Sequence, residues 1–218
     1  EMFRKLAGLT AIAGLFVVGT ASAAVTGSAH DFSAIDFGTI GTNGEVCVVC
    51  HAPHSNLNEA NDLLWNHSNV GQTATYSVYS SPSLDATAGQ PGAVSLLCLG
   101  CHDGTVAVDS YGTNTGTALI DDALFGGDTA AFGSALSDDH PIGITYADGT
   151  DLELRPDTYS SYTLGSGTPN SIATDFLFSN VVECGSCHDV HDTKSDGNPA
   201  LLLVDNADSA FCLVCHNK

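Results

Sequence analysis

All eight cysteines of this 218-residue chain fall in four copies of one motif, Cys-x-x-Cys-His. In this motif the two thiols add to the vinyl groups of a porphyrin, and the histidine becomes an axial ligand of the iron. The pattern therefore predicts four covalently bound haem c groups, haem 1 to haem 4, on motifs 1 to 4 in chain order. The predicted attachment residues are Cys47, Cys50, Cys98, Cys101, Cys184, Cys187, Cys212 and Cys215, and the predicted proximal ligands are His51, His102, His188 and His216.

Three other uses of paired cysteines compete with this interpretation. Two Cys-x-x-Cys pairs can form a four-cysteine zinc site, and a single pair can act as a redox dithiol or join a disulfide framework. None of these uses requires a histidine directly after the second cysteine, yet a histidine stands there in all four copies. We therefore favour haem attachment.

The first 23 residues have the pattern of a signal peptide. Arg4 and Lys5 are followed by an apolar run, residues 6–18, and then by small residues up to Ala23. This is the order of the basic, apolar and cleavage regions of a secretory leader, and the run is too short for a comfortable membrane span. We expect cleavage after Ala23 and an extracellular or cell-surface location, with the periplasm as the alternative.

The chain is strongly acidic, with a formal net charge of −20 at pH 7. After the leader its only basic residues besides histidine are Arg155, Lys194 and Lys218. Such a surface repels nucleic acid and anionic lipid, so we expect neither as a partner. Cations, positively charged mineral surfaces and basic redox partners are compatible with this charge.

Small and polar residues dominate between the motifs, so the chain has little apolar core of its own. We expect a haem-cored multihaem cytochrome c, mostly coil with short α-helices and a few short β-strands. Strands are predicted over residues 73–79, 142–146 and 176–178. We expect one domain, residues 24–218, with haems 1 and 2 in 47–111, a Gly/Thr/Asp-rich segment in 112–180, and haems 3 and 4 in 181–218.

Each haem iron needs a second axial ligand or keeps an open site. Methionine is not available after the leader, because the only methionine is Met2. Five candidates for four irons indicate bis-histidine ligation throughout, with one histidine to spare. The histidines outside the motifs are His30, His54, His67, His140 and His191.

The positions of these histidines rank them. His54 and His191 each follow a motif histidine by three residues. In a helical turn that spacing puts both rings on one face, so the second ring reaches a neighbouring haem and not the same one. His30 and His140 lie beside aspartates, which can accept the second ring proton. We expect His30, His54, His140 and His191 to be the distal ligands, and we leave out His67.

Seven segments together resemble the tetrahaem extracellular cytochromes of metal-reducing prokaryotes, some of which polymerise into filaments with a continuous chain of haems. The resemblance implies distal ligands at the same four histidines, and a basic residue is common in the family at the position of His67. One departure is Asp189-Val190, where a proline is common before the histidine. The segments are His30–Ser33, Cys47–His54, Leu64–Asn66, Ser95–Gly104, Asp139–Gly143, Cys184–His191 and Phe211–Lys218.

With both axial positions filled, an iron cannot bind substrate and can only exchange electrons. We expect an electron carrier and not an enzyme, assembled head-to-tail as a homopolymer, with redox partner cytochromes and extracellular acceptors such as metal oxides. His30 either ligates a haem of the adjacent subunit or folds back onto haem 1 or haem 2 of its own chain. The alternatives are a soluble periplasmic electron shuttle and a multihaem reductase with one open haem site. The shortage of basic residues to hold an anion disfavours the reductase.

Overall fold

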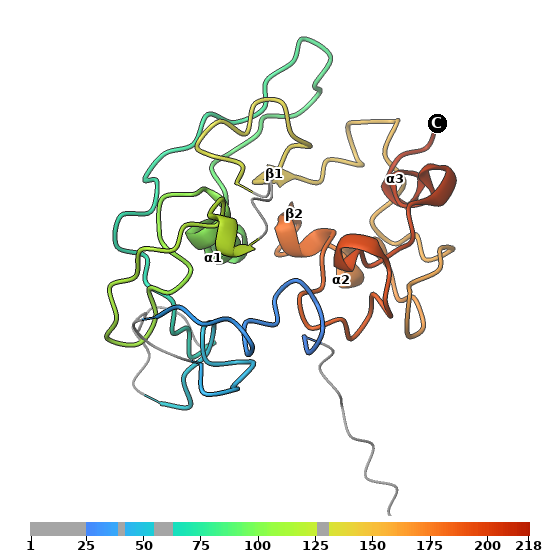
Figure 1. Ribbon diagram of the computed structural model, residues 1–218. Helices are drawn as coiled ribbons and strands as arrows, with labels where there is room; N and C mark the ends of the chain where they lie inside the picture. The colour runs from blue at the N-terminus through green and yellow to red at the C-terminus, as the bar shows by residue number, and fades with distance from the viewer. Residues whose placement is uncertain (1–24, 39–41, 55–62, 126–130) are drawn as a thin grey trace, which may run out of the picture.

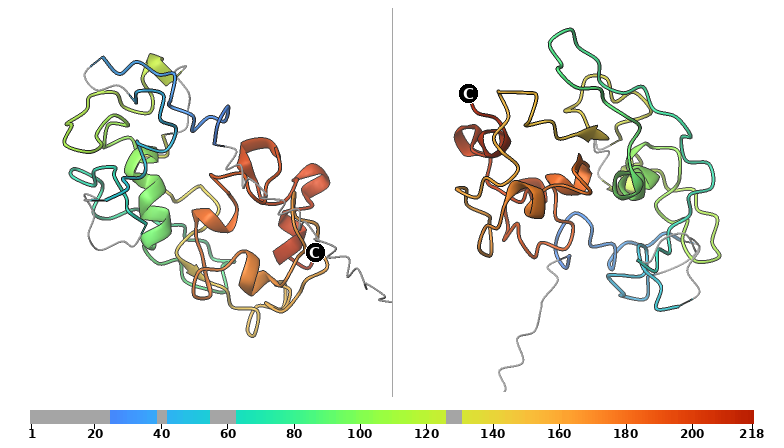
Figure 2. Two further views of the ribbon diagram at one scale, coloured as in Figure 1. Left: turned by 90° about the horizontal axis from the view of Figure 1, so that it is seen from below. Right: turned by 180° about the vertical axis from the view of Figure 1, so that it is seen from behind.

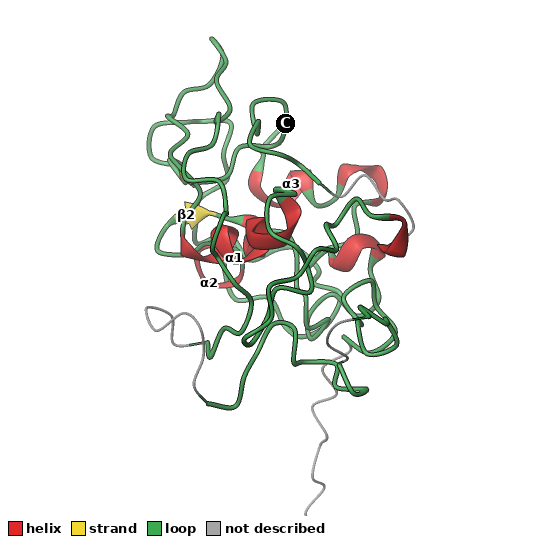
Figure 3. Cartoon of the chain, turned by 60° about the vertical axis from the view of Figure 1, so that its left-hand side comes forward, coloured by secondary structure: helices red, strands yellow, loops and turns green. Residues whose placement is uncertain are grey.

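Coil and turns make up most of the protein (Figures 1 and 3). The computed structural model describes residues 25–38, 42–54, 63–125 and 131–218, so the predicted signal peptide, residues 1–23, lies outside the described part. The expectation of a mostly coil fold with short helices and a few short strands is confirmed. The helices are α1 (Ala93–His102), α2 (Ile172–Asp175) and α3 (Cys212–Cys215), and the 3-10 turns are η1 (Ala123–Phe125), η2 (Cys184–Ser186), η3 (Pro199–Leu201) and η4 (Ala207–Ser209).

Two short strands, β1 (Ile144–Thr145) and β2 (Val181–Val182), pair in antiparallel fashion. In Figure 1 they lie between the blue-to-green part of the chain, which holds α1, and the orange-to-red part, which holds α2 and α3. The two further views show the same two parts side by side (Figure 2). No helix in the described part of the chain is long and apolar enough to cross a bilayer.

The strand predictions fared unevenly. The strand expected within residues 142–146 is confirmed as β1. The strand expected over residues 73–79 is wrong: only Ser77 makes an isolated bridge, to Ala135, and the side chain of Gln90 takes both backbone hydrogen bonds of Tyr76, at 2.8 and 3.0 Å. The strand expected over residues 176–178 is also wrong, since this segment follows directly on α2 and only Phe178 makes a local bridge, to Val181.

Helix α1 carries motif 2 and buries one side of its surface. Its buried residues include Ser95 and Leu99, which are four positions apart and therefore lie on the same face. The helix ends where Gly104, with φ of +74°, donates its N–H to the carbonyl of Cys101 at 3.0 Å. Glycine adopts this left-handed conformation without the cost that a side chain would add.

In the described part of the chain, three small apolar clusters take the place of a single large core. One holds Phe176 and Val214 around α2 and α3, a second holds Val49 and Tyr111, and a third joins Leu99 of α1 to neighbouring loops. Each cluster contains a spacer residue from a different Cys-x-x-Cys-His motif. The apolar packing of this chain is therefore built beneath the predicted attachment sites.

Candidate functional site

Each of the four motifs closes into one compact turn. In motifs 1, 3 and 4 the N–H of His51, His188 and His216 donates to the carbonyl of the first cysteine, at 2.8, 3.1 and 2.9 Å. Motif 2 forms the last turn of α1. A turn of this kind brings two sulfur atoms and one imidazole to the same short stretch of surface, which is what two thioether bonds and one axial bond to a single haem require.

The second spacer residue anchors each turn. Val49, Gly100, Ser186 and Val214 are all buried, whereas all eight cysteines are exposed or partly exposed and carry free thiols. The motifs therefore hold their backbone through the spacer and leave the sulfur atoms accessible for attachment. The four cysteine pairs form no disulfide framework.

Backbone carbonyls orient three of the candidate ligands. The Nδ1 atoms of His51 and His188 lie 2.8 Å from the carbonyls of Leu63 and Ala200. The Nδ1 atom of His140 lies 3.1 Å from the carbonyl of Pro141. When Nδ1–H donates to a carbonyl, the Nε2 lone pair is left for a metal, and such contacts fix the ring orientation in many metal sites.

Three motif histidines have a partner imidazole at a short and similar distance. The ring centres are 6.0 Å apart for His30 and His102, 6.1 Å for His51 and His191, and 6.5 Å for His140 and His216. A metal–imidazole bond of about 2 Å, with the ring centre about 1.2 Å beyond the nitrogen, puts two imidazoles on opposite sides of one metal about 6.4 Å apart. The residues present therefore fit a bis-histidine iron at three positions.

His30 lies opposite His102 of its own chain. The structure therefore has the arrangement in which His30 folds back onto its own chain. Burial, with smaller effects of His102 and His188, lowers the pKa of His30 to about 4, which leaves the ring neutral at pH 7. Its Nδ1 atom is buried and has no hydrogen-bond partner among the described residues. A neutral, buried and unpaired imidazole suits a group that binds a metal. Ligation across subunits stays a prediction.

His67 is packed inside the protein and does not face a motif histidine. It is 1% exposed, and its Nε2 atom lies 3.0 Å from the carbonyl of Ala107 and 3.4 Å from Sγ of Cys101. Burial lowers its pKa, although the hydrogen bonds act in the opposite direction. The ring is thus a neutral part of the wall beside motif 2. The sequence showed that one histidine was spare but not that it is buried there.

The sulfur atoms of successive motifs lie near one another. Thiols of adjacent motifs shift one another's pKa: burial and then Cys50 raise the pKa of Cys101, Cys184 raises that of Cys98, and burial and then Cys215 raise that of Cys187. The thiols stand here for the thioethers of a loaded protein. Attachment points of neighbouring motifs are therefore adjacent in the order 1, 2, 3, 4.

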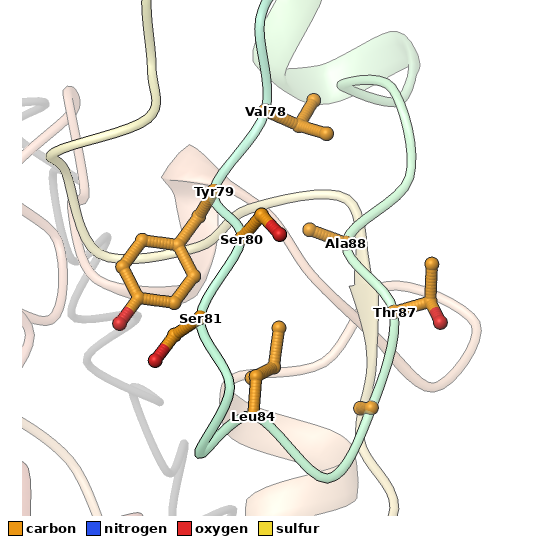
Figure 4. Close-up of a pocket in the computed structure, with 8 residues that line it drawn as sticks. Val78, Tyr79, Ser80, Ser81, Leu84, Thr87 and Ala88 are labelled. Carbon is orange, nitrogen blue, oxygen red and sulfur yellow. The ribbon is translucent and has the colours of Figure 1, made fainter.

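The described residues include no group of three or more histidine, cysteine or carboxylate side chains placed to hold a metal ion. A hollow of about 230 Å³ opens between the two limbs of the loop around Leu84, lined by Val78, Tyr79 and Ala88 among others (Figure 4). Its described lining contains no histidine, cysteine or carboxylate. This hollow therefore has the shape of a pocket without the groups of a catalytic site.

Comparison with known families supports the interpretation of the motifs. Residues 179–218, which contain motifs 3 and 4, match the family described as the doubled CXXCH motif. No curated protein matches the chain. The family match, the attachment turns and the paired imidazoles indicate a multihaem c-type cytochrome with covalently bound haem c.

Proposed function

We propose that the chain is an electron carrier that holds four haems, each between two histidines. The observation that carries this proposal is the spacing of 6.0–6.5 Å between three motif histidines and three of the expected distal ligands. Haem, when bound, supplies the one-electron redox chemistry. The chain's part is to attach it, to fill both axial positions and to leave no open site for a substrate.

The fourth haem, on motif 3, would take His54 as its distal ligand. His191, three residues after the motif 3 histidine, lies opposite His51 of motif 1. His54 occupies the corresponding place after motif 1. The exchange is then reciprocal, because each of motifs 1 and 3 ligates the haem of the other. Such crossed ligation would clamp haems 1 and 3 together. His67, packed against motif 2, is not needed.

The arrangement of the motifs suits transfer from haem to haem. Because attachment sulfurs of successive motifs are adjacent, each haem would have neighbours close by, and electrons would pass without leaving the protein. The high negative charge favours cationic or mineral acceptors over nucleic acid.

A coulometric redox titration of the purified protein tests this function. We expect four electrons per chain and no binding of carbon monoxide to the native reduced protein. Stoichiometric binding of carbon monoxide would instead favour a reductase with an open haem site.

For location and assembly, we propose an exported protein that forms head-to-tail filaments at or outside the cell surface. The N-terminal segment that carries His30 is the feature that favours this assembly. Since its ring reaches motif 2 within one chain, exchange of the same segment between copies would keep the contact and join the chains. Electron microscopy of the secreted fraction should show filaments for the wild type and none for His30→Ala. Single molecules of both proteins in the periplasm, with no filaments, would support the shuttle.

A further inference from the structure

Glu183 is a buried carboxylate at the junction between motif 2 and motif 3. The residue is 5% exposed and stands directly before Cys184. It is the residue before η2, which contacts α1. A carboxylate is rarely found buried unless donors or a counter-charge stabilise it.

Donors from the start of α1 and from Gly92 just before it stabilise this carboxylate. Both of its oxygens accept the N–H of Gly92, at 3.1 Å each, and one also accepts the hydroxyl of Ser95. Ser95 in turn accepts the N–H of Cys184 at 2.9 Å. Each of these groups donates to the carboxylate, which suits the ionised form, because that form can only accept hydrogen bonds.

Two glycines lie where the chain segments approach each other at this junction. A Cβ on Gly92 would collide with Oε1 of Glu183 unless that side chain shifted, and a Cβ on Gly185 would lie 2.8 Å from the ring of Phe178. The two glycines thus permit a close approach between the helix that bears haem 2 and the turn that bears haem 3. At this junction the thiol of Cys184 raises the pKa of Cys98, and the thiol of Cys98 lowers that of Cys184.

Among the described residues, no lysine or arginine pairs with Glu183. Lys194 pairs with Asp175 at 3.6 Å and Lys218 with Glu153 at 2.7 Å, and Arg155 donates to the carbonyl of Leu213 at 2.8 Å. A buried, unneutralised negative charge is screened much less than an exposed one. It favours the oxidised iron of a nearby haem over the reduced iron, because oxidation adds positive charge.

We propose that Glu183 is a positioning residue that holds the attachment sites of haems 2 and 3 together and whose buried charge lowers the reduction potential of at least one of these haems. The proposal rests on the proposed function, since it requires haems on motifs 2 and 3. It also explains why an acidic residue is buried here: the same side chain sets the spacing of haems 2 and 3 and lowers a reduction potential of this pair.

The test uses Glu183→Gln in the full, haem-loaded protein. Glutamine keeps the size and one acceptor oxygen but removes the charge. We expect at least one of the four reduction potentials to rise by about 59 mV, which corresponds to a tenfold change in a one-electron equilibrium constant. Spectroelectrochemical titration measures this shift. Glu45→Gln is the matched control: Glu45 is exposed and lies two residues before Cys47. We expect it to shift the potentials by less than a third as much.

The outcomes separate this inference from the proposed function. If wild-type protein lacks four low-spin haems, the proposed function fails. If the wild type has them and Glu183→Gln shifts no potential, or shifts it no more than Glu45→Gln does, the role of Glu183 is refuted. If Glu183→Gln does not load haem, Glu183→Asp decides, because it keeps the charge. Loading of that variant supports the proposal, and failure to load overturns it.

Discussion

Replacing Phe176 with alanine tests whether the apolar cluster beneath motif 4 stabilises the protein. Phe176 is 2% exposed, and its ring centre lies 5.1 Å from that of Tyr162 and 5.7 Å from that of Phe211. Phe211 stands directly before Cys212, so this packing connects α2 to the motif 4 turn. Truncation of a buried phenylalanine costs about 3–5 kcal/mol in free energy of unfolding.

That loss is large compared with the total stability of about 5–15 kcal/mol that is typical of folded domains. For a chain of this size, 1 kcal/mol corresponds to about 2–4 °C, so Tm should fall by about 10 °C. The assay is thermal unfolding of the oxidised, haem-loaded protein followed by circular dichroism. Leu152→Ala, at a side chain that is 87% exposed, is the control and should change Tm by no more than about 2 °C. A decrease in Tm of less than about 3 °C for Phe176→Ala would refute the reasoning. The region around α2 and motif 4 would then be stabilised by haem contacts and not by this cluster.

Two further predictions concern ligation and acid stability. His191→Ala should let one carbon monoxide bind per chain, at the haem on the peptide that contains His51. His67→Ala should let none bind. Binding at the motif 3 haem would contradict the crossed ligation. Burial alone would raise the pKa of Asp175, but hydrogen bonds, first from Asn170, lower it overall. Its contribution to stability is therefore complete above the unfolded value of about 3.9 and is lost as the pH falls through the folded value. Acid unfolding of Asp175→Asn should show a weaker pH dependence below pH about 4 than that of the wild type, and identical curves would count against this role.

The coil-rich fold and the closed turns of the motifs could be read from the sequence because both depend on local features. A Cys-x-x-Cys-His motif carries its own geometry, and a chain poor in apolar periodicity forms few regular elements. Helix α2 was missed although Ser171 offered a signal: its hydroxyl accepts the N–H of Thr174 at 3.2 Å, as an N-terminal helix cap does. The strand expected over residues 73–79 failed because the side chain of Gln90 takes the backbone hydrogen bonds of Tyr76 that a partner strand would otherwise make.

The relations between motifs could not be read from the sequence. The pairing of His51 with His191 joins positions 140 residues apart, and no pattern near either residue selects the other. The same holds for Glu183, whose donors lie in α1. A single acidic residue before a motif looks like solvent-exposed charge until the chain folds. Tertiary contacts decide which haems are neighbours and which charges act on them.

The intact mass of the denatured protein tests the central claim most directly. Four covalently bound haems should add their combined mass to the polypeptide, and the pyridine haemochrome spectrum should give the same number. A chain that carries fewer haems after expression with a complete haem-attachment system, or that carries zinc on its cysteines, would contradict the account.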